Sequence, residues 1–573
     1  MWSSYSPPLP EQRFLLDRVH GLSDILRLYG DEADLQTCWS ILEGAARFAK
    51  DVLSPLNPVG DRIGSKLAAG RVIMPPGFRE AYEAFASQGW PSLSAPREFG
   101  GQGLPLLLQL AVSELIIGGC ASFAMLPLQQ RAAVKVLATH GHSKSINDII
   151  SAIIAGRCGA TISMTEADAG SDPGRGRTRA ISRSDGMFEL RGSKIFISFA
   201  DHDLTPQIAH LVLAREPDGP GGSRCMSLFL VRKWLDDACT VRNAAHVTAI
   251  EQKMGLKASP TCVLSLDGAI GERIGPAGKG LNTIFTMVNV MRLEVSIQGI
   301  AVGHAAYASA RAYADERLQG DNAAGYGPVP LVDHPDVRRN LMTMRARIEG
   351  MRALIFEVAR QFDLAERAEP TAREDARLLA EFLLPICKTA GSEAGFEVTN
   401  LALQIFGGYG YVADTGIEQY VRDIRVASIF EGANGIQAID LLTRKLVDRE
   451  GRRWEIFIRT IRQDLAKLDG VAFANELSEA LDSLEEVAAE MRGRLTRDRD
   501  LALAGATPFL QLVAVVALGW TWLRLQAAGV AEVQPDAKLG NVSEFFFANL
   551  FPLHQIYRQQ VISGSYSLFT SGV

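Results

Sequence analysis

Hydrophobic positions recur at helical spacing over the first part of the chain. Trp39, Leu42, Ala46 and Ala49 lie three and four residues apart, as one buried face of a helix requires. The same kind of spacing continues to the end of this stretch. Residues 1–158 are therefore predicted to form an N-terminal helical domain.

Short alternating apolar runs replace the helical spacing after this point. Phe188 to Leu190 and Ile195 to Ile197 alternate apolar with polar positions, and Asp185-Gly186 before them is a hairpin turn signal. Clusters of Gly, Pro and Asp separate further apolar runs of strand length. Residues 159–281 are therefore predicted to form a central antiparallel β-domain.

Helical spacing then returns, because Ile284, Val288, Met291 and Val295 step by four, three and four residues. The predicted fold class is mainly α with a central antiparallel β-domain, in the order α–β–α, plus a C-terminal helical extension. The last two predicted domains are residues 282–450 and residues 451–573.

One apolar segment of the extension, Pro508 to Ala528, is long enough to span a bilayer. Gln511, Thr521 and Arg524 interrupt it, and helical sequence surrounds it. It is predicted to be a buried bundle helix, and membrane contact is not expected.

Composition narrows the functional classes. A hydrophobic content of 47% with 22% charged residues describes a soluble globular protein, and a net charge of -6 gives no global attraction for nucleic acid. The seven cysteines form no C-x-x-C pair, and the nine histidines form no zinc-binding pattern, so a reducing compartment and no metal are expected. The N-terminus has no basic segment followed by an apolar one, so a cytoplasmic location is expected.

The most informative stretch runs from Ile429 to Gln437 and places Glu431 between an aromatic residue and a glycine. A carboxylate in an apolar pocket has a raised pKa and is a stronger base. Gly432 allows a ligand to approach the backbone closely. Such a group suits removal of a weakly acidic carbon-bound proton. Taken alone, the stretch is equally consistent with a surface glutamate at a turn.

Three further motifs occur in a fixed order along the chain: Ile162 to Asp172, Lys194 to Ser198, and Gln404 to Tyr411. Together with the stretch around Glu431, they resemble the acyl-CoA dehydrogenase family of flavoproteins. The resemblance covers roughly residues 35 to 450. The first residues and the tail after Leu446 are similar to the longer bacterial subgroup of that family.

The resemblance implies α,β-dehydrogenation of an acyl-CoA thioester to the trans-2-enoyl-CoA, with FAD as the hydride acceptor. It implies that Glu431 is the base and that its backbone N–H donates to the thioester carbonyl, with Gly432 beside the substrate. It assigns Ser171 and Arg292 to the CoA thioester. On spacing alone, Arg292 is better explained as a solvated cation.

The resemblance also implies which residues hold the flavin. The residues that contact the chain's own FAD are Met164, Thr165, Phe196 and Ser198. The residues that reach a neighbouring subunit's FAD are Arg317, Gln404, Gly407 and Gly408. Because each flavin would then contact two chains, the resemblance implies a homodimer or homotetramer. Without the resemblance, residues 162–172 would form an ordinary loop entering the β-domain, and Phe196 would be a core strand residue.

Alternative functions fit the same residues. The expected electron acceptor is an electron-transfer flavoprotein. The chain could instead be an acyl-CoA oxidase, which passes the electrons to oxygen. It could also be a desaturase that acts on an acyl group bound to a carrier protein. A third alternative is not an enzyme: the chain could be an inactive relative of the family that binds no flavin and serves as a binding or scaffold protein. Bound flavin that bleaches with acyl-CoA separates the enzyme from the scaffold.

Overall fold

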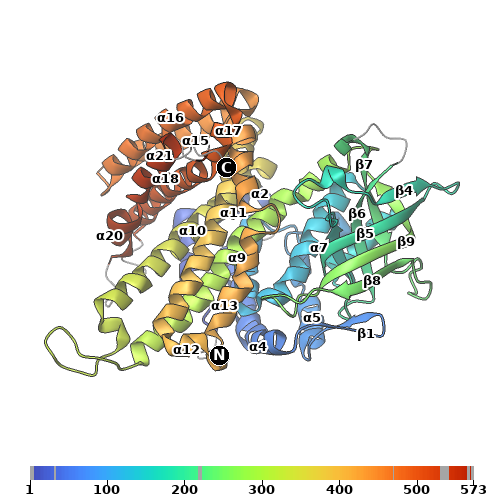
Figure 1. Cartoon of the computed structure of the whole chain (residues 1–573), viewed down its shortest axis with the longest axis horizontal. Helices are drawn as coiled ribbons and strands as arrows, with labels where there is room; N and C mark the ends of the chain where they lie inside the picture. The colour runs from blue at the N-terminus through green and yellow to red at the C-terminus, as the bar shows by residue number, and fades with distance from the viewer. Residues whose placement is uncertain are drawn as a thin grey trace. The chain divides into compact units, whose positions relative to one another are not determined.

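The structure is a computed structural model that describes residues 5–30, 34–216, 222–468, 470–529, 541–563 and 568 (Figure 1). The chain divides into two compact units. Unit 1 comprises residues 1–50, 105–118 and 292–573, and unit 2 comprises residues 51–104 and 119–291. Both units therefore contain pieces of the predicted N-terminal domain. The predicted domain boundaries follow chain order, and they stay predictions.

Unit 2 contains the strands, drawn mainly in green in Figure 1. A two-stranded sheet precedes the large one. The strands are β1 (Lys66–Ala68), β2 (Arg71–Ile73), β3 (Cys158–Ser163), β4 (Arg179–Ser182), β5 (Phe188–Ser198), β6 (Gln207–Arg215), β7 (Met226–Arg232), β8 (Ala245–Ile250) and β9 (Thr261–Ile274). The β1–β2 hairpin lies within the predicted helical region, where Ala69 and Gly70 turn the chain with positive φ values of 49° and 72°.

The larger sheet has the order β3-β6-β4-β5-β9-β7, with β8 beside β9. Because β7 also pairs with β6, the pairings close into a ring. Most neighbours are antiparallel, as predicted, but β4 pairs with β6 in parallel at one position, and β3 runs parallel to β6. The long connection between these two strands, which contains β4 and β5, allows this crossover.

The helices of unit 2 are α4 (Ser54–Ile63), α5 (Phe78–Ser87), α7 (Ala121–His140), α8 (Lys144–Ile154) and the start of α9 (Gly280–Glu316). Of these, α7, α8 and the start of α9 share a core with the larger sheet. On α8, Ile146, Ile149, Ile150 and Ile153 form one buried face. That face belongs to a core shared with β3, β6 and β7. The Ser143 side chain caps the helix by accepting from the backbone N–H of Ile146 at 3.2 Å.

Unit 1 is helical in its described part. It contains most of α9, and the other helices are α1 (Leu9–Phe14), α2 (Leu22–Tyr29), α3 (Leu35–Phe48), α6 (Leu106–Gly119), α10 (Pro335–Arg367), α11 (Pro370–Phe406), α12 (Gly408–Tyr411), α13 (Ile417–Ile424), α14 (Asn434–Asp440), α15 (Arg452–Lys467), α16 (Ala474–Arg497), α17 (Arg499–Ala504), α18 (Ala506–Ala527), α20 (Val542–Phe545) and α21 (Leu553–Ile562).

The long helices α9 and α11 approach each other very closely. A Cβ added at Gly299 would lie 2.1 Å from the carbonyl oxygen of Gly391, and one added at Gly395 would lie 2.5 Å from that of Gly299. Only glycine fits such a crossing. This contact brings the polar side chains on α9 and α11 near the same loop, the one that carries Glu431.

The extension forms a bundle in which α18 contacts α16 and α21, and also α10, α11 and α14 of the same unit (Figure 1). Helix α18 is long and apolar enough to cross a membrane, but 83% of its most apolar window is buried. Trp520 and Trp522 are among the largest fully buried side chains. The helix is therefore buried in a bundle, as the sequence predicted.

Candidate active site

Glu431 lies in a strained turn just before α14. Its φ is 54°, in the left-handed region, and that of Gly432 is 87°. A Cβ at Gly432 would lie 2.6 Å from Nε2 of Gln437. This amide nitrogen donates to the carbonyl oxygens of Gly432 at 3.1 Å and Glu431 at 3.4 Å. A non-glycine residue held at positive φ costs about 1–3 kcal/mol, and such strain clusters at functional sites.

The surroundings of Glu431 favour its protonated form. Burial raises the pKa of the Glu431 carboxyl above its ordinary value, and the positive charges of Lys388 and Arg292 oppose that rise without cancelling it. Within the described part of the chain, no protein group donates a hydrogen bond to this carboxylate. The predicted rise in pKa is therefore present, and the assignment of Glu431 as the base stays a prediction.

Arg292 lies on α9, beside the backbone of the same turn. It is only 8% exposed, and its Nη1 donates to Oδ2 of Asp440 at 2.9 Å. Its Nη2 lies 3.8 Å from the Cβ position of Gly432. The interpretation as a solvated cation is therefore wrong. Its predicted contact with CoA stays a prediction.

Three of the four residues predicted to serve a neighbour's FAD lie around a second region of unit 1. A cavity of about 490 Å³ is lined by Arg317, Gly407, Gly408 and Tyr409, among others. The guanidinium of Arg317 lies 6.0 Å from the centre of the Tyr409 ring, and both side chains are exposed. A Cβ at either glycine would meet nothing within 4 Å, so their backbone is open to a ligand.

This chemistry fits a dinucleotide. An exposed guanidinium suits a phosphate, an exposed ring suits a base, and open backbone allows close approach. Gln404 is exposed and its carbonyl oxygen accepts from the N–H of Gly407 at 3.0 Å, but it does not line the cavity. Its role toward FAD stays a prediction.

In unit 2, the predicted flavin loop is fastened to β5. The backbone N–H of Ile195 donates to the carbonyl oxygen of Thr165 at 3.0 Å. The buried Lys194 ammonium donates to the carbonyl oxygen of Met164 at 3.1 Å and to Oε1 of Glu166 at 2.7 Å. These contacts fix the path of the loop through Met164 and Thr165.

Glu166 closes the other end of the same loop. Its carboxylate accepts from the backbone N–H groups of Arg177 at 2.6 Å and Thr178 at 3.1 Å. Burial opposes its ionisation, but Lys194 and these N–H groups outweigh burial and hold the pKa of Glu166 below its ordinary value. A buried ion pair therefore organises the loop, and its role toward flavin stays a prediction.

The remaining predicted residues of unit 2 are accessible. Phe196 is 59% exposed and has a φ of 58°, at a bulge in the pairing of β5 with β9. It is therefore not a core strand residue, and its ring is free to lie against a ligand. Ser198 is partly exposed and Ser171 is exposed. Their predicted contacts with flavin and CoA stay predictions.

Sequence reasoning missed the contacts of several polar residues around the predicted site residues, although two of them lie inside the motifs. The clearest are Lys194 and Lys388, both fully buried. Asn434, which accepts from Lys388 at 3.0 Å, is a third. The signal was available for Lys388, because it follows the apolar run Leu383 to Cys387 on one helix. A charge at such a position needs a nearby partner.

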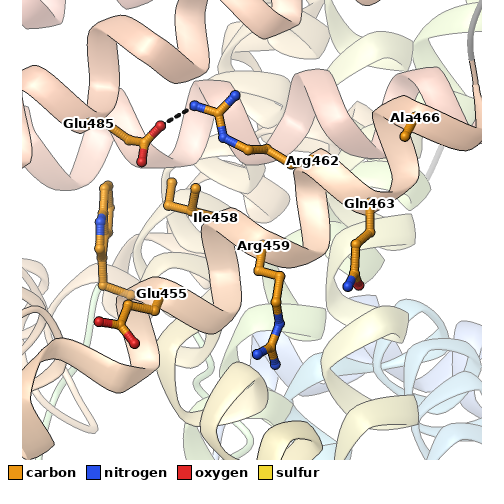
Figure 2. Close-up of a pocket in the computed structure, with 8 residues that line it drawn as sticks. Glu455, Ile458, Arg459, Arg462, Gln463, Ala466 and Glu485 are labelled. Carbon is orange, nitrogen blue, oxygen red and sulfur yellow. Dashed lines mark hydrogen bonds and ion pairs between the residues drawn. The ribbon is translucent and has the colours of Figure 1, made fainter.

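A surface hollow of about 490 Å³ lies on the extension, between α15 and α16 (Figure 2). Arg462 forms ion pairs with Glu485 and Asp482, and Arg459 pairs with Asp375. The arginines of this hollow are thus already paired with carboxylates of the chain. It contains none of the predicted site residues.

Sequence models of one family match nearly the whole chain. The acyl-CoA dehydrogenase N-terminal, middle and C-terminal domains match residues 40–157, 161–269 and 278–446. A model described as acetyl-CoA dehydrogenase C-terminal like matches residues 457–571.

The similarity to two curated relatives covers nearly the full length of both this chain and the relative. The chain is 36% identical to 3-methylmercaptopropionyl-CoA dehydrogenase of Ruegeria pomeroyi, covering 98% of this chain and 96% of that protein. It is 32% identical to the broad-specificity linear acyl-CoA dehydrogenase FadE5 of Mycobacterium tuberculosis, covering 96% of each.

Solved structures show the same fold. An acyl-CoA dehydrogenase complexed with FAD from Bacillus anthracis has a TM-score of 0.75 at 18% identity, covering 93% of this chain and 89% of that one. Caenorhabditis elegans ACDH-11 in complex with C11-CoA has a TM-score of 0.70 at 21% identity, covering 97% and 90%.

These matches confirm the predicted fold class, the predicted oxidoreductase reaction and FAD as the cofactor. The similarity continues through the extension, as the resemblance to the longer bacterial subgroup implied. The chain belongs to the acyl-CoA dehydrogenase family.

Proposed function

We propose that Glu431 is the base that removes the α-proton of an acyl-CoA thioester, giving the trans-2-enoyl-CoA. The observation that carries this proposal is a carboxylate whose pKa is raised by burial, in a strained turn, with no protein donor bound to it in the described chain. Bound FAD supplies the hydride acceptor that no side chain can provide. The protein's part is to place the substrate, take the proton and stabilise charge.

The backbone of the same turn stabilises the developing enolate. The N–H of Glu431 donates to the thioester carbonyl oxygen, where negative charge accumulates as the α-proton leaves. Loss of one donor at such a position costs about 2.7–4 kcal/mol of transition-state stabilisation. The strained φ of Glu431 supports this role.

The substrate is a CoA thioester, and the acceptor is an electron-transfer flavoprotein in the cytoplasm. Support for the thioester comes from the two long relatives, both described as dehydrogenases of CoA thioesters. A carrier-protein desaturase and an oxidase use the same base, and the relatives do not favour either.

Absorbance of the purified protein tests the reaction. A yellow protein whose flavin bleaches anaerobically on addition of saturated acyl-CoA agrees with the proposal. Reoxidation by electron-transfer flavoprotein and not by air separates a dehydrogenase from an oxidase. A colourless protein that stays colourless after incubation with FAD contradicts it.

We further propose that each FAD is held by two chains, so that the enzyme is a homodimer or homotetramer. Support comes from Arg317 and Gly407, which face an open cavity in unit 1. Arg317→Ala is expected to lower flavin occupancy at unchanged expression, whereas Arg339→Ala, an exposed arginine on α10, is not. Native mass spectrometry that finds a fully flavinated monomer would contradict this assembly.

A further inference from the structure

Lys388 is a buried cation whose fixed partner is an amide. It lies on α11 with no exposed surface, and its Nζ donates to Oδ1 of Asn434 at 3.0 Å. Asn434 begins α14, three residues after Glu431. An ammonium this deeply buried without a bonded carboxylate is costly, so its retention needs a reason.

Asn434 connects the ammonium to a neighbouring carboxyl group. Its Nδ2 donates to Oε1 of Glu393 at 3.1 Å, and the side chain also exchanges hydrogen bonds with the buried Ser392 at 3.2 and 3.3 Å. The carboxyls of Glu393 and Glu431 both interact electrostatically with Lys388. The amide is therefore a rigid spacer between the lysine and Glu393.

We propose that Lys388 is a positioning residue for the base, whose buried positive charge sets the proton affinity of Glu431 while Asn434 holds it in place. This inference rests on the proposed role of Glu431. It adds a second residue that does not touch the substrate and acts only through the base.

The other charges around this pair come from several helices. Arg292 on α9 faces both Glu431 and Lys388, and Arg347 on α10 faces Glu393. Helix α18 of the extension contributes the neutral Gln511, which forms a hydrogen bond with Glu393. Burial lowers the pKa of Lys388 itself to about 8, so its positive charge is present at neutral pH and is lost in mild alkali.

The geometry explains why the base is not simply neutralised. Burial alone would keep Glu431 protonated and unable to accept a proton. A lysine bonded directly to the carboxylate would do the opposite and make it a weak base. A charge held nearby on an amide gives an intermediate proton affinity, which suits a general base.

The test is the pH profile of flavin reduction by acyl-CoA in the flavinated enzyme. Lys388→Met removes the charge at nearly equal length, so the pKa of Glu431 rises and the acidic limb moves up by about one pH unit or more. Lys388→Arg restores a charge and returns the limb toward the parent. Lys467→Met, an exposed lysine of the same unit, leaves the limb in place.

Thermal unfolding provides a readout independent of turnover. The gain in Tm from Glu431→Gln is measured against pH in the parent and in the Lys388→Met variant. In the Lys388→Met variant, this gain in Tm should reach its plateau at a higher pH than in the parent. The plateau should move by as many pH units as the acidic limb of the kinetic profile. Asn434→Asp is a second variant, because a new carboxylate beside Lys388 offsets its charge and moves the limb in the same direction.

The outcomes separate this inference from the proposed function. If the acidic limb of both Lys388→Met and Asn434→Asp lies within about 0.3 pH units of the parent's limb, the role of Lys388 is overturned, while Glu431 remains the base. Full turnover in Glu431→Gln overturns the proposed function itself. A limb that moves in both variants, with the matching shift in Tm, supports the inference.

Discussion

Two glutamates of this enzyme lie near buried lysines, and their pKa values move in opposite directions. Glu431 in unit 1 has Lys388 nearby, and its pKa is raised. Glu166 in unit 2 has Lys194 nearby, and its pKa is lowered. Burial acts in the same direction on both, so burial alone does not explain the difference.

The difference comes from where the hydrogen bonds go. Lys194 bonds directly to Glu166 at 2.7 Å, and two backbone N–H groups add to it. Lys388 instead bonds to an amide and acts on Glu431 only through its charge. Donors bonded to a carboxylate stabilise its ionised form, so Glu166 anchors a loop whereas Glu431 is suited to accept a proton.

Glu431→Gln has the largest expected effect. The amide is nearly isosteric, so the fold and bound flavin persist, but no base remains for the α-proton. Flavin reduction by acyl-CoA should fall by about 10²- to 10⁴-fold, as measured by anaerobic stopped flow. Glu479→Gln, an exposed glutamate on α16, serves as the control and should match the parent. Reduction within a few-fold of the parent would assign the base elsewhere.

Glu166→Gln should act on stability first. It leaves the Lys194 ammonium buried without its counter-charge, which costs about 3–5 kcal/mol in free energy of unfolding. Denaturant unfolding of the flavinated protein measures this loss. In Glu189→Gln, where the glutamate pairs with the exposed Arg191, the cost should be about 0–1 kcal/mol. Equal losses in the two variants would show that the buried pair has no special role.

The sequence identifies one of these two glutamates much better than the other. Glu431 is recognisable because its aromatic and glycine neighbours are adjacent in the chain. The anchoring role of Glu166 depends on Lys194, which is 28 residues away and reaches it only through the path of β5. The Lys388–Asn434 contact spans 46 residues.

The same reasoning applies to the fold. Periodicity predicted the helical and strand regions, and the apolar run in the extension predicted a buried α18. It did not predict the parallel pairing of β3 with β6, because local pattern does not encode which strands become neighbours. Local pattern also did not predict that Arg292 is buried and paired with Asp440, because that ion pair joins two helices, α9 and α14, that are far apart in the sequence.

The smallest expected effect is the change of stability with pH that each glutamate causes. This change has opposite signs for Glu431 and Glu166, so it contrasts the two residues most directly. Glu431 has a raised pKa in the folded state, so its stabilising contribution is present below its unfolded pKa and is lost as pH rises through the folded value. Glu431→Gln should therefore raise Tm relative to the parent near pH 7, and the gain should shrink as the pH falls through the raised folded value and vanish below the unfolded pKa. Glu166 has a lowered pKa, so its contribution is present above its unfolded pKa and is lost as pH falls through the folded value. Glu166→Gln should therefore lower Tm near pH 7, and this loss should shrink in acid. Differential scanning calorimetry of the three proteins between about pH 2.5 and pH 8 measures both differences. Two curves of the same sign would mean that both carboxylates are anchored alike, and the distinction between base and anchor would fail.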